Sequence, residues 1–136
     1  MLEAAAKAVA GSSTEILAVT VLTSHTDASL RETGAAGTVA ETVRLLATLA
    51  RDAGIGGLVS SPHEVPLIRE AVGKGMLVVT PGIRPSGAAL GDQARVTTPG
   101  DAMRLGCDYI VVGRPITEAA SPADAARTIV DQLSRG

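Results

Sequence analysis

The sequence is poor in aromatic residues: its 136 residues include one tyrosine, Tyr109, and neither tryptophan nor phenylalanine. Proteins that bind single-stranded nucleic acids stack the bases on aromatic side chains, so this composition excludes a stacking platform of that kind. A formal net charge of −2 provides no basic field for nucleic acid or a membrane surface. Any anion site must therefore be local, made by a few arginines and backbone amides.

Cysteine and long apolar runs are also scarce. The single cysteine, Cys107, excludes an internal disulfide and fits a reducing compartment. It lies just before a predicted strand, and we interpret it as a small buried apolar residue. No run approaches the roughly 18 apolar residues of a membrane span, and the opening helical pattern has no signal-peptide cleavage site. We expect a cytoplasmic protein without a membrane partner.

Lysine and histidine are too few to suggest acid–base chemistry. Lys7 falls in the predicted opening helix, and Lys74 falls in a turn before a strand, so neither is placed as a catalytic acid. His25 follows a strand as a polar rim residue, and His63 lies in a first helical turn where exposure to solvent is the default. We assign no role to either histidine.

A repeated helix start is the strongest structural signal that the sequence contains. A hydroxyl residue is followed three positions later by an acid at Thr38-x-x-Glu41, Ser61-Pro-x-Glu64, Thr98-Pro-x-Asp101 and Ser121-Pro-x-Asp124. The hydroxyl accepts a hydrogen bond from a free backbone amide of the first turn. The acid accepts one from the amide of the hydroxyl residue or interacts favourably with the helix dipole, and proline is tolerated in the first turn. Each motif therefore predicts a helix N-terminus.

Apolar runs and glycines complete the pattern. Strands are predicted over residues 16–22, 58–59, 76–79 and 109–112, helices over 2–10 and 27–32, and helix ends at Gly54, Gly73 and Gly106. Four successive strand–helix units predict one α/β domain over residues 1–136, with a parallel sheet that is either a small open doubly wound sheet or part of a closed barrel. An eight-unit barrel needs about 250 residues, so this length favours half of one.

One unit carries a long insertion. The helix starts at Thr38, Ser61, Thr98 and Ser121 are separated by 23, 37 and 23 residues. The excess falls within residues 81–97, after a strand and before its helix, which is the side where α/β folds bind ligands. Arg84 and Gln93 supply polar groups there. A tolerated surface loop is the alternative, but the arginines and glycines favour a binding loop.

A second candidate site follows the last predicted strand. Gly113 and Arg114 place bare backbone and a guanidinium together, which suits a phosphate group. A helix-entry turn with a surface arginine is the alternative. The lysine of a phosphate-binding loop and the glycine pattern of a dinucleotide-binding turn are both absent from the sequence.

Five motifs in order, VTVLTS, VSSPHEV, VVTPGIRPSG, GDQARVTTP and DYIVVGRPIT, together resemble the second half of the orotidine 5′-phosphate decarboxylase family. The resemblance implies the C-terminal half of a (β/α)8 barrel, usually a homodimer. It also implies decarboxylation of orotidine 5′-phosphate to UMP in pyrimidine synthesis, without a metal or organic cofactor.

The resemblance carries particular roles onto this sequence. Thr23 matches the residue that meets the pyrimidine, with Ser24 as the next candidate. Arg84 and Gln93 match phosphate contacts of the long loop, where we expect both to ride on a mobile segment ordered by ligand. Gly113 and Arg114 match the phosphate-binding pair of the last strand.

The family's Asp-x-Lys-x-x-Asp motif, whose lysine protonates the carbon that loses carbon dioxide, has no match here. We therefore assign no catalytic residue to this chain and expect it to be inactive alone. We expect it to form a homo-oligomer or to need the N-terminal half. The alternative is a non-catalytic half-barrel that binds a phosphorylated ligand or a complementary half. A sugar-phosphate epimerase of related architecture is a third possibility, which the combination of the TPGIRP and GDQ motifs disfavours.

Overall fold

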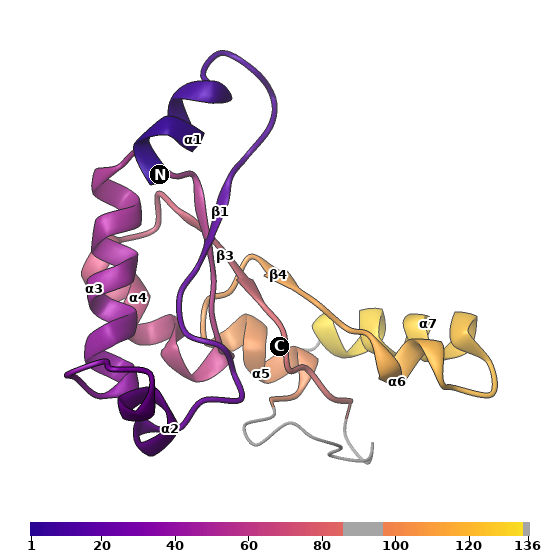
Figure 1. The fold of residues 1–136 in the computed structure, drawn as a ribbon. Helices are drawn as coiled ribbons and strands as arrows, with labels where there is room; N and C mark the ends of the chain where they lie inside the picture. The colour runs from indigo at the N-terminus through magenta and orange to yellow at the C-terminus, as the bar shows by residue number, and fades with distance from the viewer. Residues whose placement is uncertain (86–96, 135–136) are drawn as a thin grey trace.

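The computed structural model describes residues 1–85 and 97–134 of the chain (Figure 1). Its strands are β1 (Leu17–Val19), β2 (Gly57–Val59), β3 (Leu77–Thr80) and β4 (Tyr109–Ile110). Its helices are α1 (Leu2–Ala8), α2 (Asp27–Glu32), α3 (Val39–Asp52), the 3-10 turn η1 (Pro62–Glu64), α4 (Val65–Val72), α5 (Pro99–Arg104), α6 (Arg114–Thr117) and α7 (Pro122–Leu133). The predicted alternation of strands and helices is confirmed.

The strands form one parallel sheet in the order β1-β2-β3-β4. In-register neighbours lie in rows across the sheet, and one row consists of Val19, Val59, Val79 and Tyr109. Because the strands are parallel and follow the order of the chain, every strand ends at the same edge of the sheet. The segments that follow the strands therefore meet at that edge, where the sequence places its candidate site.

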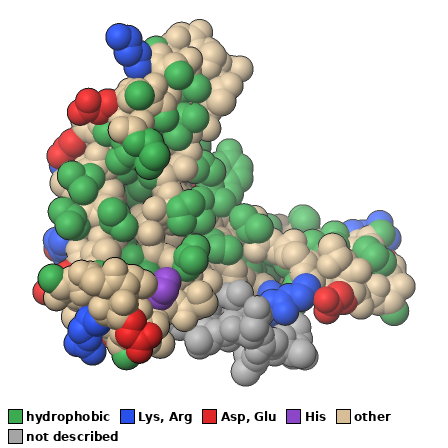
Figure 2. All heavy atoms as spheres, in the orientation of Figure 1, with side chains coloured by type: hydrophobic (Ala, Val, Ile, Leu, Met, Phe, Trp, Pro, Cys, Tyr) green, Lys and Arg blue, Asp and Glu red, His purple; other side chains and the backbone are tan. Residues whose placement is uncertain are grey.

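The two faces of the sheet differ. Leu58 and Val78, neighbours in one row, are fully buried and belong to a core that includes Val43 and Ile68 of α3 and α4. The alternate row begins with Val19 and ends with Tyr109, which are 56% and 58% exposed. Helices α3 and α4 lie along one side of the strands, and Figure 2 shows hydrophobic side chains gathered over the other side. Among the described residues, that second face has no helical cover.

Three of the four predicted N-caps are confirmed. The Thr38 hydroxyl accepts a hydrogen bond from the Glu41 amide, and Thr98 and Ser121 cap α5 and α7 in the same way. Ser61 differs: it precedes η1 rather than an α-helix, its side chain makes no capping bond, and its hydroxyl is fully buried. The prediction of a side-chain cap at Ser61 was wrong because the first turn tightens into a 3-10 turn before α4 begins.

The predicted helix ends are confirmed at Gly54, Gly73 and Gly106, each of which has a positive φ. Several boundaries differ. The strand predicted over residues 16–22 is reduced to Leu17–Val19, and the strand predicted over 109–112 is reduced to Tyr109–Ile110. Among the described residues, both are outer strands with a neighbour on one side only, so fewer ladder hydrogen bonds hold their ends. The opening helix stops at Ala8. The short helix α6 starts with Gly113 as its N-cap and Arg114 as its first residue, which matches the helix-entry turn given above as the alternative for this pair.

Candidate functional site

The carboxyl end of β3 leads into the long loop through a sharp turn. Gly82 has a φ of 80°, a conformation that favours glycine, and it turns the chain directly after Pro81. Ile83 then forms an isolated parallel bridge with Thr97, and the Arg84 amide donates to the Thr97 carbonyl at 3.0 Å. The two ends of the loop are therefore joined at its base.

Arg84 belongs to this base. Arg84 is only 9% exposed, and its Nη1 donates a hydrogen bond to the Ile83 carbonyl at 3.1 Å. The expectation that Arg84 rides on a mobile loop stays a prediction, and in this structure the Ile83–Thr97 bridge joins the backbone next to Arg84. Its guanidinium is held where the loop begins, at the edge where the strands end.

The returning end of the loop is held by the cap of α5. The Thr98 hydroxyl accepts from the Asp101 amide at 3.2 Å and donates to the Asp101 carboxylate at 2.5 Å. The hydrogen bond from Thr98, with a further one from Arg104, holds the pKa of Asp101 below its usual 3.8. At neutral pH the ionised Asp101 carboxylate therefore accepts the Thr98 hydroxyl and holds Thr98, the residue next to Thr97, at the start of α5.

The carboxyl end of β4 presents Gly113 and Arg114. Gly113 is the N-cap of α6, and Arg114 is its first residue. Both residues are exposed, and a Cβ added to Gly113 would meet no other atom within 4 Å. The backbone at Gly113 therefore faces open space, which leaves room for a ligand to approach.

The sheet order brings these groups into proximity. Arg84 follows β3 and Arg114 follows the adjacent β4, so two guanidinium-bearing residues come from neighbouring strand ends. Thr23 follows β1 at the far side of the sheet. Strand β1 is three strand spacings, or roughly 14 Å along the sheet, from β4, the strand that Arg114 follows. It is partly buried, whereas the neighbouring Ser24 is exposed. The geometry places two arginines on one side of the sheet and the Thr23 hydroxyl on the other. Gln93 lies outside the described residues.

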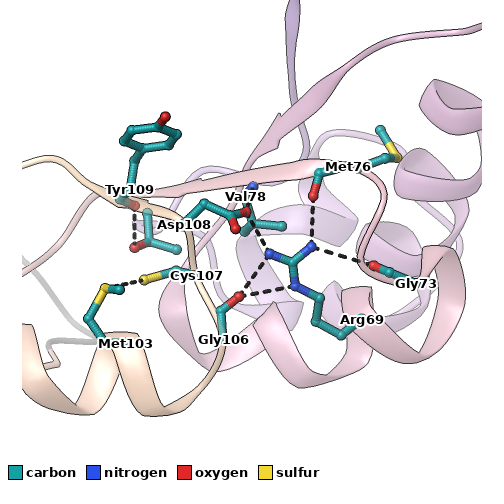
Figure 3. Close-up of polar contacts among 10 residues, drawn as sticks. Arg69, Gly73, Met76, Val78, Met103, Gly106, Cys107, Asp108 and Tyr109 are labelled. Carbon is teal, nitrogen blue, oxygen red and sulfur yellow. Dashed lines mark hydrogen bonds and ion pairs between the residues drawn. The ribbon is translucent and has the colours of Figure 1, made fainter.

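A second cluster, absent from the sequence predictions, lies at the opposite end of the strands (Figure 3). The Arg69 guanidinium donates to the carbonyls of Gly106 and Met76, at 2.8 and 2.7 Å, and to the Asp108 carboxylate at 2.6 Å. An open hollow of about 390 Å³ lies beside it, lined also by Lys74 and Cys107. Arg69 and Asp108 are 39 residues apart, and the only signal in the sequence is an aspartate placed just before a strand.

Cys107 is 4% exposed at this end of β4, which confirms the prediction of a small buried residue. Burial raises the pKa of its thiol. Within residues 1–85 and 97–134, no group of three or more His, Cys, Asp or Glu side chains could hold a metal ion. In the same part of the chain, no helix is long and apolar enough to cross a membrane.

Comparison with known proteins gives a consistent result. The family model described as "Orotidine 5'-phosphate decarboxylase / HUMPS family" matches residues 1–129. The orotidine 5′-phosphate decarboxylase of Geobacter sulfurreducens is 56% identical over 126 residues, covering 93% of this chain and 53% of that protein. That of Halorhodospira halophila is 55% identical over 136 residues, covering 98% of this chain and 58% of that protein.

A solved structure agrees with the family match. The crystal structure of orotidine 5′-phosphate decarboxylase from Lactobacillus acidophilus has a TM-score of 0.81 and 38% identity, and the match covers 98% of this chain and 58% of that one. The chain thus spans about half the length of the curated relatives it matches. Its four strand–helix units correspond to about half of a (β/α)8 barrel, which confirms the predicted fold class.

Proposed function

This chain belongs to the orotidine 5′-phosphate decarboxylase / HUMPS family, and from that premise we propose that it is the phosphate-binding half of an orotidine 5′-phosphate decarboxylase. The reaction breaks the bond between the pyrimidine ring and its carboxylate, releases carbon dioxide, and leaves UMP after a proton reaches the ring carbon. The proposal includes a place in pyrimidine synthesis. It also includes a cytoplasmic location, since a single cysteine fits a reducing compartment.

The observation that carries the proposal is the pair of guanidinium-bearing residues at adjacent strand ends. Arg84 is anchored at the base of the loop after β3, and Arg114 follows Gly113 at the end of β4. In (β/α)8 enzymes the loops after the last two strands commonly bind a phosphate. We propose that Arg114 and the Gly113 amide hold one side of the phosphate, and that Arg84 and Gln93 hold the other. Thr23 contacts the pyrimidine.

The chemical step needs groups that this sequence lacks. Neither Lys7 nor Lys74 lies within an Asp-x-Lys-x-x-Asp motif, and Lys74 lines the hollow at the opposite end of the strands. Positioned acids and charges supply much of an enzyme's rate enhancement, so binding groups alone leave the barrier high. The proposal therefore requires a complementary half that brings the lysine and its flanking carboxylates.

Complementation tests the proposal. The N-terminal half of the Geobacter sulfurreducens relative is produced separately and mixed with this chain, and the loss of orotidine 5′-phosphate is followed. We expect turnover from the mixture, none from either half alone, and a loss of turnover when the mixture contains Arg114→Ala. Lys7→Ala, in α1, is the control and leaves turnover unchanged.

Two outcomes contradict the proposal. Turnover by the pure chain alone would show that the missing lysine motif is dispensable. A stoichiometric complex of the two halves that binds UMP without turnover would favour the alternative of a non-catalytic half-barrel, since the motif is absent from this sequence.

A further inference from the structure

The segment between β1 and α2 carries Thr23, and its backbone forms a closed turn. The His25 amide donates to the Leu22 carbonyl at 3.0 Å, so residues 22–25 make a β-turn with Thr23 and Ser24 at its centre. Among the described residues only glycines have a positive φ, so the turn is of a kind that Thr and Ser adopt without strain. The closing bond joins backbone groups, so it uses neither of the two central hydroxyls.

The chain that enters the turn is fixed to the sheet and the core. The Thr20 amide donates to the Val59 carbonyl at 3.0 Å, and the Thr20 hydroxyl lies 3.0 Å from the Ser60 hydroxyl. Val21 follows and is 6% exposed. The first residue of the turn, Leu22, is therefore placed by β2 and by the core.

The chain that leaves the turn is tied to α2 by a side chain. His25 is partly buried, and its Nδ1 lies 3.1 Å from the Ser29 Oγ. A hydroxyl can donate or accept, so this hydrogen bond forms with either tautomer of the imidazole. His25 therefore takes part in two contacts: its amide closes the turn, and its ring joins the turn to α2.

Helix α2 is itself anchored, which gives the His25 contact a fixed support. The Ser29 hydroxyl accepts the Thr26 amide at 3.0 Å as part of the cap of α2. The Asp27 carboxylate accepts the amide of Val39, the first residue of α3, at 2.7 Å. Leu30 is 7% exposed in the core. The support for His25 thus extends through α2 to α3.

We propose that His25 is a positioning residue for the pyrimidine, and that it acts through Ser29 to hold Thr23 and Ser24 in the turn. The inference rests on the proposed function, in which Thr23 contacts the base. A turn that already has its bound geometry is ordered before the ligand arrives, so less affinity is lost in ordering it. Without the His25 ring the turn samples other conformations, and the apparent affinity falls with the fraction that remains competent.

Two ligands test this role in the complemented protein, the mixture of this chain with the N-terminal half. UMP has both base and phosphate, whereas ribose 5-phosphate lacks the base. We expect His25→Ala to weaken UMP binding about three- to ten-fold, the worth of one hydrogen bond, and to leave ribose 5-phosphate binding unchanged. A variant that merely damaged the fold would weaken both ligands.

Three further variants sharpen the test. His25→Asn, whose side-chain amide can replace Nδ1 as a hydrogen-bonding group, should restore most of the affinity for UMP. Ser29→Ala should weaken UMP binding as His25→Ala does, and the double variant should be little worse than either. Thr48→Ala is the control, because it removes a hydroxyl that donates to the Arg44 carbonyl within α3 and should change neither affinity.

Unchanged UMP binding in His25→Ala, or equal weakening of the two ligands, would overturn the inference. A mixture that binds neither ligand contradicts the proposed function instead, and hydrogen exchange of this chain then decides whether His25 holds the turn. A protection factor of the residue 25 amide that falls in His25→Ala and recovers in His25→Asn supports that role. The same protection in His25→Ala as in the unsubstituted chain refutes it.

Discussion

Arg69 and Asp108 join α4 to the start of β4 through a contact of 2.6 Å between Nη2 and Oδ2. The same carboxylate oxygen accepts the Val78 amide at 2.7 Å, and the Asp108 amide donates to the Val78 carbonyl at 2.9 Å. The pair therefore fixes where β4 begins against β3. The Arg69 side chain is 16% exposed and also satisfies the Gly106 and Met76 carbonyls.

Replacing Arg69 should destabilise the fold without touching the phosphate site. Arg69→Ala removes charge-assisted hydrogen bonds to two carbonyls and a carboxylate, so we expect the free energy of unfolding to fall by about 2–3 kcal/mol. Urea denaturation at one fixed protein concentration measures it. Arg44→Ala is the matched control: its ion pair with Glu70 is well exposed, and its loss should cost less than about 1 kcal/mol. Equal losses in the two variants would contradict the assignment of Arg69 as a structural clamp.

Arg114 and Arg84 should respond differently to alanine substitution in the complemented protein. We expect Arg114→Ala to weaken UMP binding by about ten- to a hundred-fold through loss of a charge-assisted hydrogen bond, with little change in melting temperature because Arg114 is exposed. Arg84→Ala should weaken UMP binding and also lower the melting temperature, since Arg84 is 9% exposed. Calorimetric titration with UMP and uridine provides the check. If Arg114→Ala weakened uridine as much as UMP, the phosphate assignment would be wrong.

Gly113 should matter for the ligand and not for the fold. Its added Cβ would meet no atom within 4 Å, so Gly113→Ala should leave the free energy of unfolding nearly unchanged while obstructing the approach of a phosphate. Gly57→Ala is the opposite case. Its Cβ would lie 2.5 Å from a Leu17 methyl and 2.9 Å from the Leu77 Cβ, so we expect a loss of about 1–3 kcal/mol. Urea denaturation and UMP titration of both variants would show whether the two effects separate.

The cap of α5 should make stability depend on pH. The pKa of Asp101 is lowered by Thr98 in the folded chain, so its contribution is complete above its ordinary pKa of 3.8 and is lost as the pH falls through the lowered folded value. Near neutral pH we expect Thr98→Ala to cost about 1 kcal/mol. The difference from the unsubstituted chain should shrink in acid. Ser61→Ala, which removes no capping bond, should show no such difference. Unfolding curves at neutral and acidic pH test both statements.

Local chemistry explains which parts of the fold could be predicted from the sequence. The caps at Thr38 and Thr98 and the turn at Gly106 involve residues within a few positions of each other, so spacing alone predicts them. The strand–helix alternation also follows from local patterns. The absence of a side-chain cap at Ser61 could not be predicted, because the choice between a 3-10 turn and an α-helix depends on packing around a buried segment.

The candidate site also has parts that could be predicted from the sequence and parts that could not. Loop length and the Gly113–Arg114 pair identify the edge where the strands end, since parallel strands in chain order must end together. The anchoring of Arg84 depends on the bridge between Ile83 and Thr97, and the clamp of Arg69 depends on a contact across 39 residues. Such contacts are set by tertiary packing and leave no periodic trace in the sequence.

The register of the sheet has a consequence for the order in which the strands assemble. Leu17 pairs with Gly57, 40 positions later, whereas Gly57 pairs with Leu77, 20 positions later. Each doubling of a loop adds about 0.6 kcal/mol of closure entropy, so the β2–β3 pair is the easier to nucleate. During synthesis β1 leaves the ribosome before β2, and it can pair with β2 only after the longer of these two connections has closed. Among the four described strands, the sheet is then expected to grow outward from the β2–β3 pair, so that β1 joins it after a strand made later in the chain.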